Sequence, residues 1–474
     1  MLQRPFNVGA TWISEDRLLD VEALVEPRKR PDGKKPHVRS GQVFRKAPEP
    51  EFFPLELSDD IRHAGLCRAI KAGLDEVDLT SVTTSYTDQG GVPYEVRSML
   101  GILVLGYCLG IRSSRALEDA CRCDVRFSFV SGGLRPDDRT IGRFRRRVGS
   151  RAKKLQKAIV GSLDKHDLAP AEQVAVDGTK QRSAASRPRK SAEELEKLGV
   201  PIPSSDPEAK LMKGSRGFVL GYNVQVAVDM GTGAVLAVDV CDTSSDRGLL
   251  APMVAEVKEM LGRAPAEVVA DKGYDSNEAH NYGSEIGTLT TVPSQDPGLA
   301  FWNVVDANVV TCPMGKEVVK DGVHMSRGRL TVHRSVPLAE CESCFLREQC
   351  RPNGCTRGLE TEQGVDPALR ILAAYRARSP EGRAALKRRM ATVEPFFGGL
   401  KWNRKMSRLS LRGTGGALIE NLLFAAAVNL GLIGRAVLTF FCLLFSSPRT
   451  SKRHNIAFGP TRAGAELLTL AKAA

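Results

Sequence analysis

The chain has 474 residues, of which 42% are hydrophobic and 26% charged, and its formal net charge at pH 7 is +13. These values are typical of a soluble globular protein with roughly two to four domains. The positive excess favours a polyanionic partner, most simply nucleic acid, although a basic enzyme without such a partner would also carry it. The eleven cysteines come without an apolar secretion signal, which argues against a disulfide framework.

Residues 1–80 form the first predicted segment, a basic N-terminal arm and linker. The part up to residue 55 is rich in Pro, Lys and Arg and has little hydrophobic periodicity. Such a composition is typical of a linker or a basic arm and not of a packed domain.

Residues 81–165 form the second predicted segment and have a helical pattern. Apolar stretches at helical spacing are separated by a polar turn at residues 112–114, and a basic helix is predicted to start at Pro136. This order resembles a helix-turn-helix DNA-binding domain, whose phosphate contacts would make binding strongly salt-dependent. The alternative is an ordinary solvated basic face. The cations expected to contact DNA are Arg139, Arg143, Arg145, Arg146, Arg147, Arg151 and Lys153.

Residues 166–432 form the third predicted segment, in which the apolar pattern changes to that of strands. A strand in EQVAVDGTK is expected to end at Asp177, and two strands around DMGTG form a predicted hairpin. An amphipathic helix in SSDRGLLAPMVAEVKEML, with a capping Ser or Asp before it, leads to a fourth strand that ends before Asp271. A further helix and a strand at 288–294 follow. The sequence therefore predicts an α/β fold with a mixed sheet flanked by helices.

Asp177 and Asp271 are predicted to lie side by side, because the fourth strand can pair beside the first through a helical crossover. Two such carboxylates repel each other and need a cation between them unless one is protonated. Hard oxygen ligands suit Mg²⁺ or Mn²⁺, and two ions about 3.5–4 Å apart can activate a nucleophile and stabilise the leaving oxygen of a phosphodiester. The alternative is plain turn and cap chemistry, which we expect for Asp275.

Glu394, in the stretch VEPFFGGLK, is the candidate third carboxylate. Because it precedes Pro395, it is expected at a kink or at a helix start. Lys401 lies seven residues further along, on the same face if the helix continues, where a cation could hold a DNA phosphate near the metals.

These stretches resemble bacterial insertion-sequence transposases of the DDE type, which have a ribonuclease H-like catalytic core. The matching motifs are VDGTK, GYNVQVAVD, ADKGYDS and VEPFFGGLK, and the resemblance covers roughly residues 80–432. It implies that Asp177, Asp271 and Glu394 are the metal-binding triad for two Mg²⁺ or Mn²⁺ ions. Related transposases often carry a Tyr-x2-Arg-x3-Glu-x6-Lys signature, in which Lys387 and Met390 stand here at the Tyr and Arg positions. Arg388 and Arg389 are the neighbouring residues that could substitute for that arginine.

The resemblance also implies the activity and the partners. A transposase of this type cleaves the ends of an insertion sequence and joins the freed 3′-hydroxyl to target DNA. The partners are then double-stranded DNA, as terminal inverted repeats and as target, and a second copy of the chain in a DNA-bound homodimer. The expected location is the cytoplasm, on the nucleoid. Two rival functions are a metal-dependent nuclease without joining activity and a DNA-binding protein with a decayed catalytic core.

Residues 295–378 are predicted to be a Cys-rich insertion in the catalytic domain. A C-x2-C pair with further cysteines is typical of tetrahedral Zn²⁺ sites, and free thiols in a reducing cytosol are the alternative. The four expected zinc ligands are Cys312, Cys341, Cys344 and Cys350.

Residues 433–474 are predicted to be a C-terminal helix and tail. The stretch 417–445 is long and apolar enough to span a membrane. Glu420 and Arg435 interrupt it, and charges within a bilayer are costly. We therefore expect one or two buried core helices and no membrane contact.

Overall fold

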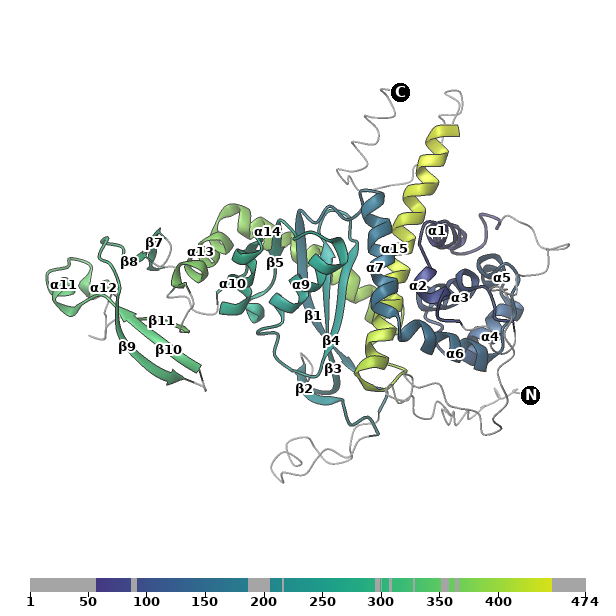
Figure 1. The fold of residues 1–474 in the computed structure, drawn as a ribbon, viewed down its shortest axis with the longest axis horizontal. Helices are drawn as coiled ribbons and strands as arrows, with labels where there is room; N and C mark the ends of the chain where they lie inside the picture. The colour runs from purple at the N-terminus through teal and green to yellow at the C-terminus, as the bar shows by residue number, and fades with distance from the viewer. Residues whose placement is uncertain are drawn as a thin grey trace, which may run out of the picture.

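The computed structural model describes residues 57–86, 92–185, 205–214, 217–294, 299, 301–306, 309–326, 329–350, 358–362 and 366–445. The predicted arm up to residue 56 and the tail from residue 446 lie outside these ranges. The molecule is elongated, with a helical region at one end, a sheet in the middle and the predicted insertion at the other end (Figure 1).

The helical region confirms the helical pattern of the second predicted segment and begins earlier than that segment, at Ala64. Its most apolar helix, α3 (Val96–Leu109), is buried over most of its length and forms the centre of the region. The predicted start near Pro136 is confirmed, because the Asp137 carboxylate accepts a hydrogen bond from the backbone N–H of Thr140. The helices are α1 (Ala64–Asp75), α2 (Thr80–Thr83), α3 (Val96–Leu109), α4 (Ser114–Cys123), α5 (Val125–Ser131), α6 (Asp138–Gly149) and α7 (Ala152–Lys165).

The central sheet has six strands. Five follow the order β2–β3–β1–β5–β6, and β4 pairs with β3 along the same edge as β2. β1 and β3 are antiparallel, and so are β3 and β4, as the predicted hairpin requires. β5 is parallel to β1, and β6 is parallel to β5. The predicted helical crossover between the first and fourth strands is thereby confirmed. The strands are β1 (Gln173–Arg182), β2 (Lys210–Gly214), β3 (Gly217–Asp229), β4 (Val235–Cys241), β5 (Glu267–Val269) and β6 (Leu289–Thr291).

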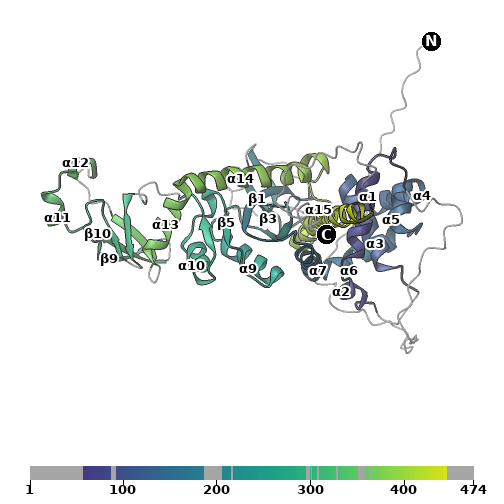
Figure 2. The ribbon, with the colours of Figure 1, turned by 90° about the horizontal axis from the view of Figure 1, so that it is seen from above.

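Helices cover both faces of this sheet. Figure 2 shows α14 along one face and α9 and α10 on the other. Val174 and Val176 of β1 belong to the same buried cluster as Val254 and Val257 of α9, which explains the apolar character of the strand. The result is a mixed α/β architecture that is consistent with the expected ribonuclease H-like fold. The helices are α9 (Leu250–Leu261), α10 (Asn277–Glu285), α13 (Pro367–Arg378) and α14 (Pro380–Gly398).

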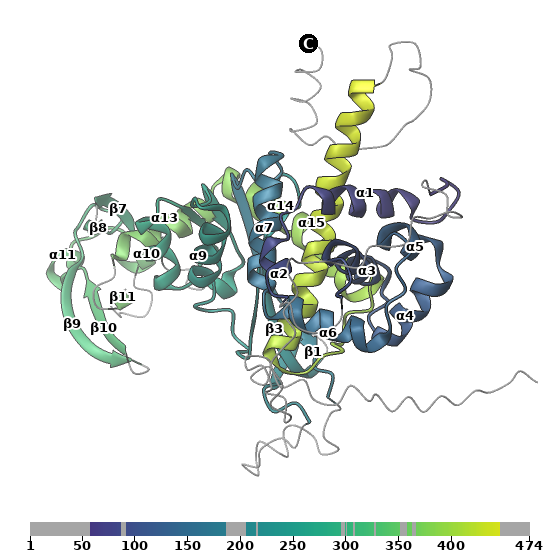
Figure 3. The ribbon, with the colours of Figure 1, turned by 45° about the vertical axis from the view of Figure 1, so that its right-hand side comes forward.

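The long apolar stretch near the C-terminus forms a single helix, α15 (Gly413–Phe445), between the sheet and the N-terminal helices (Figure 3). Asn429 accepts a hydrogen bond from the Val235 backbone N–H and donates one to its carbonyl, both at 2.8 Å, so this polar residue joins the helix to β4. Among the described residues, α15 is the one unbroken helix that is long and apolar enough to cross a membrane. Of its most apolar 18-residue stretch, 61% is buried inside the protein. This burial is consistent with the predicted core helix.

The crossing of α1 and α15 depends on two glycines. A Cβ atom at Gly73 would collide with the backbone carbonyl of Leu430, and a Cβ atom at Gly434 would collide with that of Ala69. Because the obstructing atoms belong to the backbone, the two helices can only move apart to make room.

Replacing Gly434 with Ala should therefore lower the free energy of unfolding by about 1–3 kcal/mol, in spite of the better helix propensity of Ala. Urea denaturation followed by circular dichroism measures this change. Gly161→Ala in α7 is the matched control, because no atom lies within 4 Å of the added Cβ, and it should stabilise by up to about 1 kcal/mol. Equal effects at the two glycines would contradict the close crossing.

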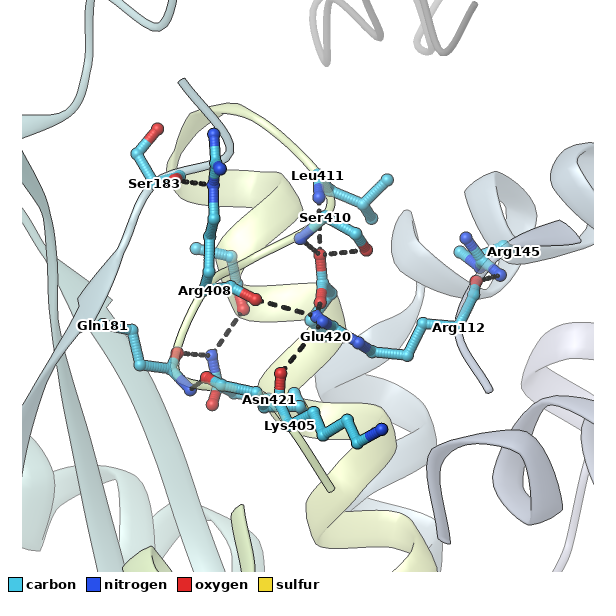
Figure 4. A network of polar contacts seen from close by, with 12 residues as sticks. Arg112, Arg145, Gln181, Ser183, Lys405, Arg408, Ser410, Leu411, Glu420 and Asn421 are labelled. Carbon is cyan, nitrogen blue, oxygen red and sulfur yellow. Dashed lines mark hydrogen bonds and ion pairs between the residues drawn. The ribbon is translucent and has the colours of Figure 1, made fainter. Parts of the chain in front are cut away.

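A buried polar network joins the helical region to the base of α15 (Figure 4). The Glu420 side chain is fully buried and pairs with the Arg112 guanidinium at 2.8 Å. Its other carboxylate oxygen accepts hydrogen bonds from the backbone N–H and hydroxyl of Ser410 and from the backbone N–H of Leu411. Arg112 also donates to the backbone carbonyl of Arg408 at 3.0 Å. The carboxylate thus orders the loop that precedes α15.

The predicted insertion has a small hydrophobic core of its own around Trp302, Val310 and Ile371. Its antiparallel strands form a three-stranded and a two-stranded sheet. These strands are β7 (Asn303–Asp306), β8 (Val309–Thr311), β9 (Val319–Ser326), β10 (Arg329–Ser335) and β11 (Gly358–Glu362), with the short helices α11 (Leu338–Glu342) and α12 (Arg347–Cys350).

Candidate active site

The register between β1 and β5 brings Asp177 and Asp271 to the same level of the sheet. Parallel pairing ends with Ala175 opposite Val269, and each aspartate follows two residues later. β1 itself continues to Arg182, because β3 pairs with it beyond the end of β5. The prediction that the first strand ends at Asp177 is therefore wrong, whereas the predicted side-by-side position of the aspartates follows from the register.

Asp271 is fixed by the turn that follows β5. Its Oδ1 accepts a hydrogen bond from the Gly273 backbone N–H at 2.7 Å and caps the short 3₁₀ helix η2 (Lys272–Tyr274). Tyr274 is buried, and its hydroxyl donates a hydrogen bond to the Gln225 side-chain carbonyl on β3. The turn is therefore anchored to the sheet, which holds the carboxylate of Asp271 beside the end of β5.

The helix after this turn is capped by Ser276, whose hydroxyl accepts a hydrogen bond from the Ala279 backbone N–H. The prediction that Asp275 is the cap is wrong. Asp275 is buried and pairs with His280 at 3.0 Å and with Arg370 of α13 at 2.8 Å. This buried ion-pair group ties α13 to the segment that carries Asp271.

A third aspartate, Asp246, lies close to Gly178 and Gly273, the glycines next to or near the two predicted aspartates. A Cβ atom at Gly178 would lie 3.0 Å from Asp246 Oδ1, and one at Gly273 would lie 3.7 Å from Asp246 Oδ2. Oδ1 accepts hydrogen bonds from the side-chain amides of Asn223 at 2.7 Å and Gln225 at 3.0 Å. The loop after β4 thus returns over the sheet and brings a carboxylate to the residues that adjoin Asp177 and Asp271.

Asp246 was not predicted as a site residue, because its position before an amphipathic helix favoured a cap. The structure shows no side-chain cap on α9, whose N-terminal flanking residue is Leu249. The sequence signal that could have identified Asp246 is an acid in the segment after the third strand, in a sheet whose first and fourth strands also place an acid after an apolar run.

The charges of the three aspartates interact. Burial raises the pKa of Asp177. Arg389 and a hydrogen bond from the Gly178 backbone N–H oppose this effect, and the carboxylates of Asp271 and Asp246 raise the pKa further. The three carboxylates also raise the pKa of Tyr274, which burial already holds well above its usual value. Such mutual repulsion favours binding of a cation among the carboxylates.

Arg389 on α14 supplies the positive charge nearest to Asp177. Its Nη1 lies 3.1 Å from Asp177 Oδ2, but the geometry of this ion pair gives no hydrogen bond. The residue is 8% exposed, and Nε and Nη1 are buried without a hydrogen-bond partner in the described part of the chain. Arg389 is adjacent to the Arg position of the transposase signature, and it has donor capacity that an incoming anion could use.

Glu394 lies five residues beyond Arg389 within α14, and its side chain is exposed. The helix begins at Pro380 and continues through Pro395, so of the two expectations for Glu394 the helix start is wrong. The described residues show no hydrogen bond or ion pair between Glu394 and either aspartate.

Lys401 lies in the π-helical turn η4 (Gly399–Asn403), because α14 does not continue as a regular helix. Burial lowers the pKa of Lys401, and the charge of Asp177 acts in the opposite direction. The Asp177 carboxylate thus favours the charged form of Lys401.

The aspartates offer the hard oxygen ligands that Mg²⁺ and Mn²⁺ prefer. Among the described residues, however, no three acidic, histidine or cysteine side chains converge closely enough to hold a metal ion. The contact of Arg389 with Asp177 explains part of this, because it directs that carboxylate towards α14. In ligand chemistry and in charge the residues suit a divalent metal.

The expected zinc site has no support in the structure. Its four cysteines form no disulfide with one another and are partly exposed. Within the described ranges they do not form a group that could hold a metal ion. Cys312 and Cys341 instead pack at the edge of the small hydrophobic core of the insertion.

Three of the cations expected to contact DNA make contacts with other parts of the protein. Arg145 is buried and donates a hydrogen bond to the Arg112 carbonyl. The guanidinium of Arg147 stacks on the Tyr86 ring at 3.8 Å from its centroid and donates to the Ser85 carbonyl. Lys153 pairs with Glu256 of α9. Exposed or half-exposed side chains are found at Arg139, Arg143, Arg146 and Arg151.

Three protein-family models match successive parts of the chain. Residues 170–293 match one model described as a transposase DDE domain, and residues 311–433 match another with the same description. Residues 55–147 match a model described as a transposase domain. The first match contains Asp177, Asp246 and Asp271, and the second contains Glu394. No curated protein matches the chain.

Proposed function

Since this chain belongs to the insertion-sequence transposases of the DDE type, we propose that it cleaves DNA at the ends of an insertion sequence and joins those ends to target DNA. The observation that carries this proposal is the position of Asp177 and Asp271 at one level of the sheet, inside a DDE-domain match. The strand order, with four antiparallel strands (β1 to β4) followed by two strands parallel to β1, supports a ribonuclease H-like core.

Transposases of this family generally use divalent metal ions, and we infer that Asp177, Asp271 and Glu394 hold two Mg²⁺ or Mn²⁺ ions here. When bound, the ions supply Lewis-acid activation of the nucleophile and stabilise the leaving oxygen of the phosphodiester. The protein itself contributes position and charge, since the nucleophile is water or the 3′-hydroxyl of DNA. The η2 turn fixes the Asp271 carboxylate, and β1 fixes the backbone of Asp177 on the neighbouring strand.

Cations on the α14 side of the sheet are proposed to bind the DNA phosphate. Arg389 has unused N–H donors beside Asp177, and Lys401 is close enough to sense the charge of Asp177. Metal ions bound to Asp177 would compete with Arg389 for the carboxylate and leave the guanidinium available to the phosphate. Glu394 lies between these two cations in the sequence. It is part of α14, which packs against β1.

The helical region is proposed to bind the terminal inverted repeats of the element. The cations with exposed side chains, Arg139 and Arg143 of α6, are the strongest candidates for phosphate contacts. Because two ends must be joined to one target, the active form is proposed to be a homodimer on DNA. It would act in the cytoplasm, on the nucleoid.

A strand-transfer assay tests this function directly. The full-length protein is incubated with Mn²⁺, precut DNA ends that carry the inverted repeats flanking the gene, and a supercoiled target plasmid. Joined products are expected, because a precut end presents the 3′-hydroxyl that attacks the target. Cleavage of uncut ends without any joined product would instead favour the rival nuclease. Binding of the repeats without cleavage or joining would favour the decayed DNA-binding protein.

A further inference from the structure

Asp246 is the acidic side chain at the site to which the triad gives no role. It lies in the loop between β4 and α9, on the far side of β3 from β1 in the sheet order. Its carboxylate nevertheless reaches Gly178 of β1 and Gly273 of the η2 turn. It therefore adjoins both strand ends that carry the predicted metal ligands.

The arrangement of Asp246 is that of a positioned ligand. Two side-chain amides, from Asn223 and Gln225, fix Oδ1. Oδ2 is directed towards Gly273, and no hydrogen bond to it is found among the described residues. Outer hydrogen bonds that orient a carboxylate while leaving one oxygen available are typical of metal ligands.

The small size of Gly178 maintains this approach. A Cβ atom there would come within 3.0 Å of both Asp246 Oδ1 and the Tyr274 hydroxyl, and would also collide with the Gln225 side chain. Any other residue after Asp177 would therefore displace the Gln225 side chain and crowd the carboxylate of Asp246. Gly178 thus keeps the third aspartate beside the other two.

An independent feature of the site also indicates a ligand. Arg389 is about nine-tenths buried, with Nε and Nη1 unpaired by hydrogen bonds in the described chain. Its side chain is directed at Asp177. Beyond its ion pair with Asp177, this buried guanidinium has N–H donors left for a second anion, the role proposed above for the DNA phosphate.

We propose that Asp246 is a further carboxylate ligand of the divalent metal ions, held by Asn223 and Gln225 on the α9 side of the sheet while Asp177 and Arg389 face α14. This inference rests on the proposed function, since it adds a ligand to the same metal site. The site would then take a carboxylate from each face of the sheet, Asp246 from the α9 side and Asp177 from the α14 side, where the cation Arg389 also lies.

Calorimetric titration of the full-length protein with Mn²⁺, without DNA, tests the proposal independently of activity. Asp246→Asn keeps the shape of the side chain and an oxygen to accept the two amide hydrogen bonds. We expect it to weaken Mn²⁺ binding by roughly tenfold or more. Its unfolding temperature without metal should be unchanged or higher, because one of three repelling charges is removed. Asp242→Asn, an exposed acid in the same loop, is the matched control and should bind as the unchanged protein does.

Asp246→Glu restores the charge and should recover part of the lost Mn²⁺ affinity. The proposal is overturned if Asp246→Asn binds Mn²⁺ with unchanged affinity, whether or not its metal-free unfolding temperature falls. Asp177→Asn and Asp271→Asn in the same titration separate this failure from that of the proposed function. If these two variants lose Mn²⁺ binding and Asp246→Asn does not, only the role of Asp246 is wrong. If neither loses binding, the proposed metal site itself is wrong.

Discussion

Replacing Asp271 with Asn is expected to lower the rate of metal-dependent DNA cleavage by roughly a thousandfold, which corresponds to about 4 kcal/mol of transition-state stabilisation. The amide keeps the oxygen that accepts the hydrogen bond from Gly273, so the turn should be preserved. Its loss of charge removes a metal ligand. Single-turnover cleavage of end-sequence DNA at saturating protein measures the effect.

DNA binding by Asp271→Asn should be retained or slightly stronger, because a negative charge near the phosphate is removed. A gel-shift titration at fixed salt provides this comparison. Glu285→Gln, an exposed acid on the adjacent helix α10, is the control and should cleave at the unchanged rate. Cleavage by Asp271→Asn within a few-fold of the unchanged protein would show that Asp271 is not a ligand.

Replacing Glu420 with Ala is expected to lower the free energy of unfolding by about 3–5 kcal/mol. The change leaves the Arg112 guanidinium without its buried partner and leaves the backbone N–H groups of Ser410 and Leu411 without their acceptor (Figure 4). Urea denaturation followed by tryptophan fluorescence and by circular dichroism measures the loss.

Glu420→Gln distinguishes the charge from the shape in this network. The Gln side chain keeps an oxygen for Ser410 and Leu411, so its cost should be clearly smaller than that of Glu420→Ala. Glu381→Ala, an exposed acid in the first turn of α14, should change stability by less than about 0.5 kcal/mol. An equally small effect of Glu420→Ala would contradict the view that this carboxylate holds the helical region to α15.

Five of the six strands of the central sheet, and the neighbouring positions of Asp177 and Asp271, could be predicted from the sequence. Strand patterns are local, since alternation and apolar runs between turn residues depend on neighbouring residues. The hairpin, the crossover to β5 and the single core helix near the C-terminus follow from such patterns. Asp177 and Asp271 could be predicted because a parallel crossover brings the ends of the two strands together.

Tertiary packing, and not local pattern, sets which charged side chains lie together at the candidate site and which make contacts elsewhere in the protein. Asp246 precedes a helix in the sequence, and only the return of its loop over β3 brings it to Gly178. Arg145 and Lys153 belong to the same basic run as Arg139 and Arg143. Arg145 nevertheless donates a hydrogen bond to the Arg112 carbonyl, and Lys153 forms an ion pair with Glu256. The physical reason is that the partner of a charged group lies far away in the chain, so its environment is set by how elements pack and not by local pattern.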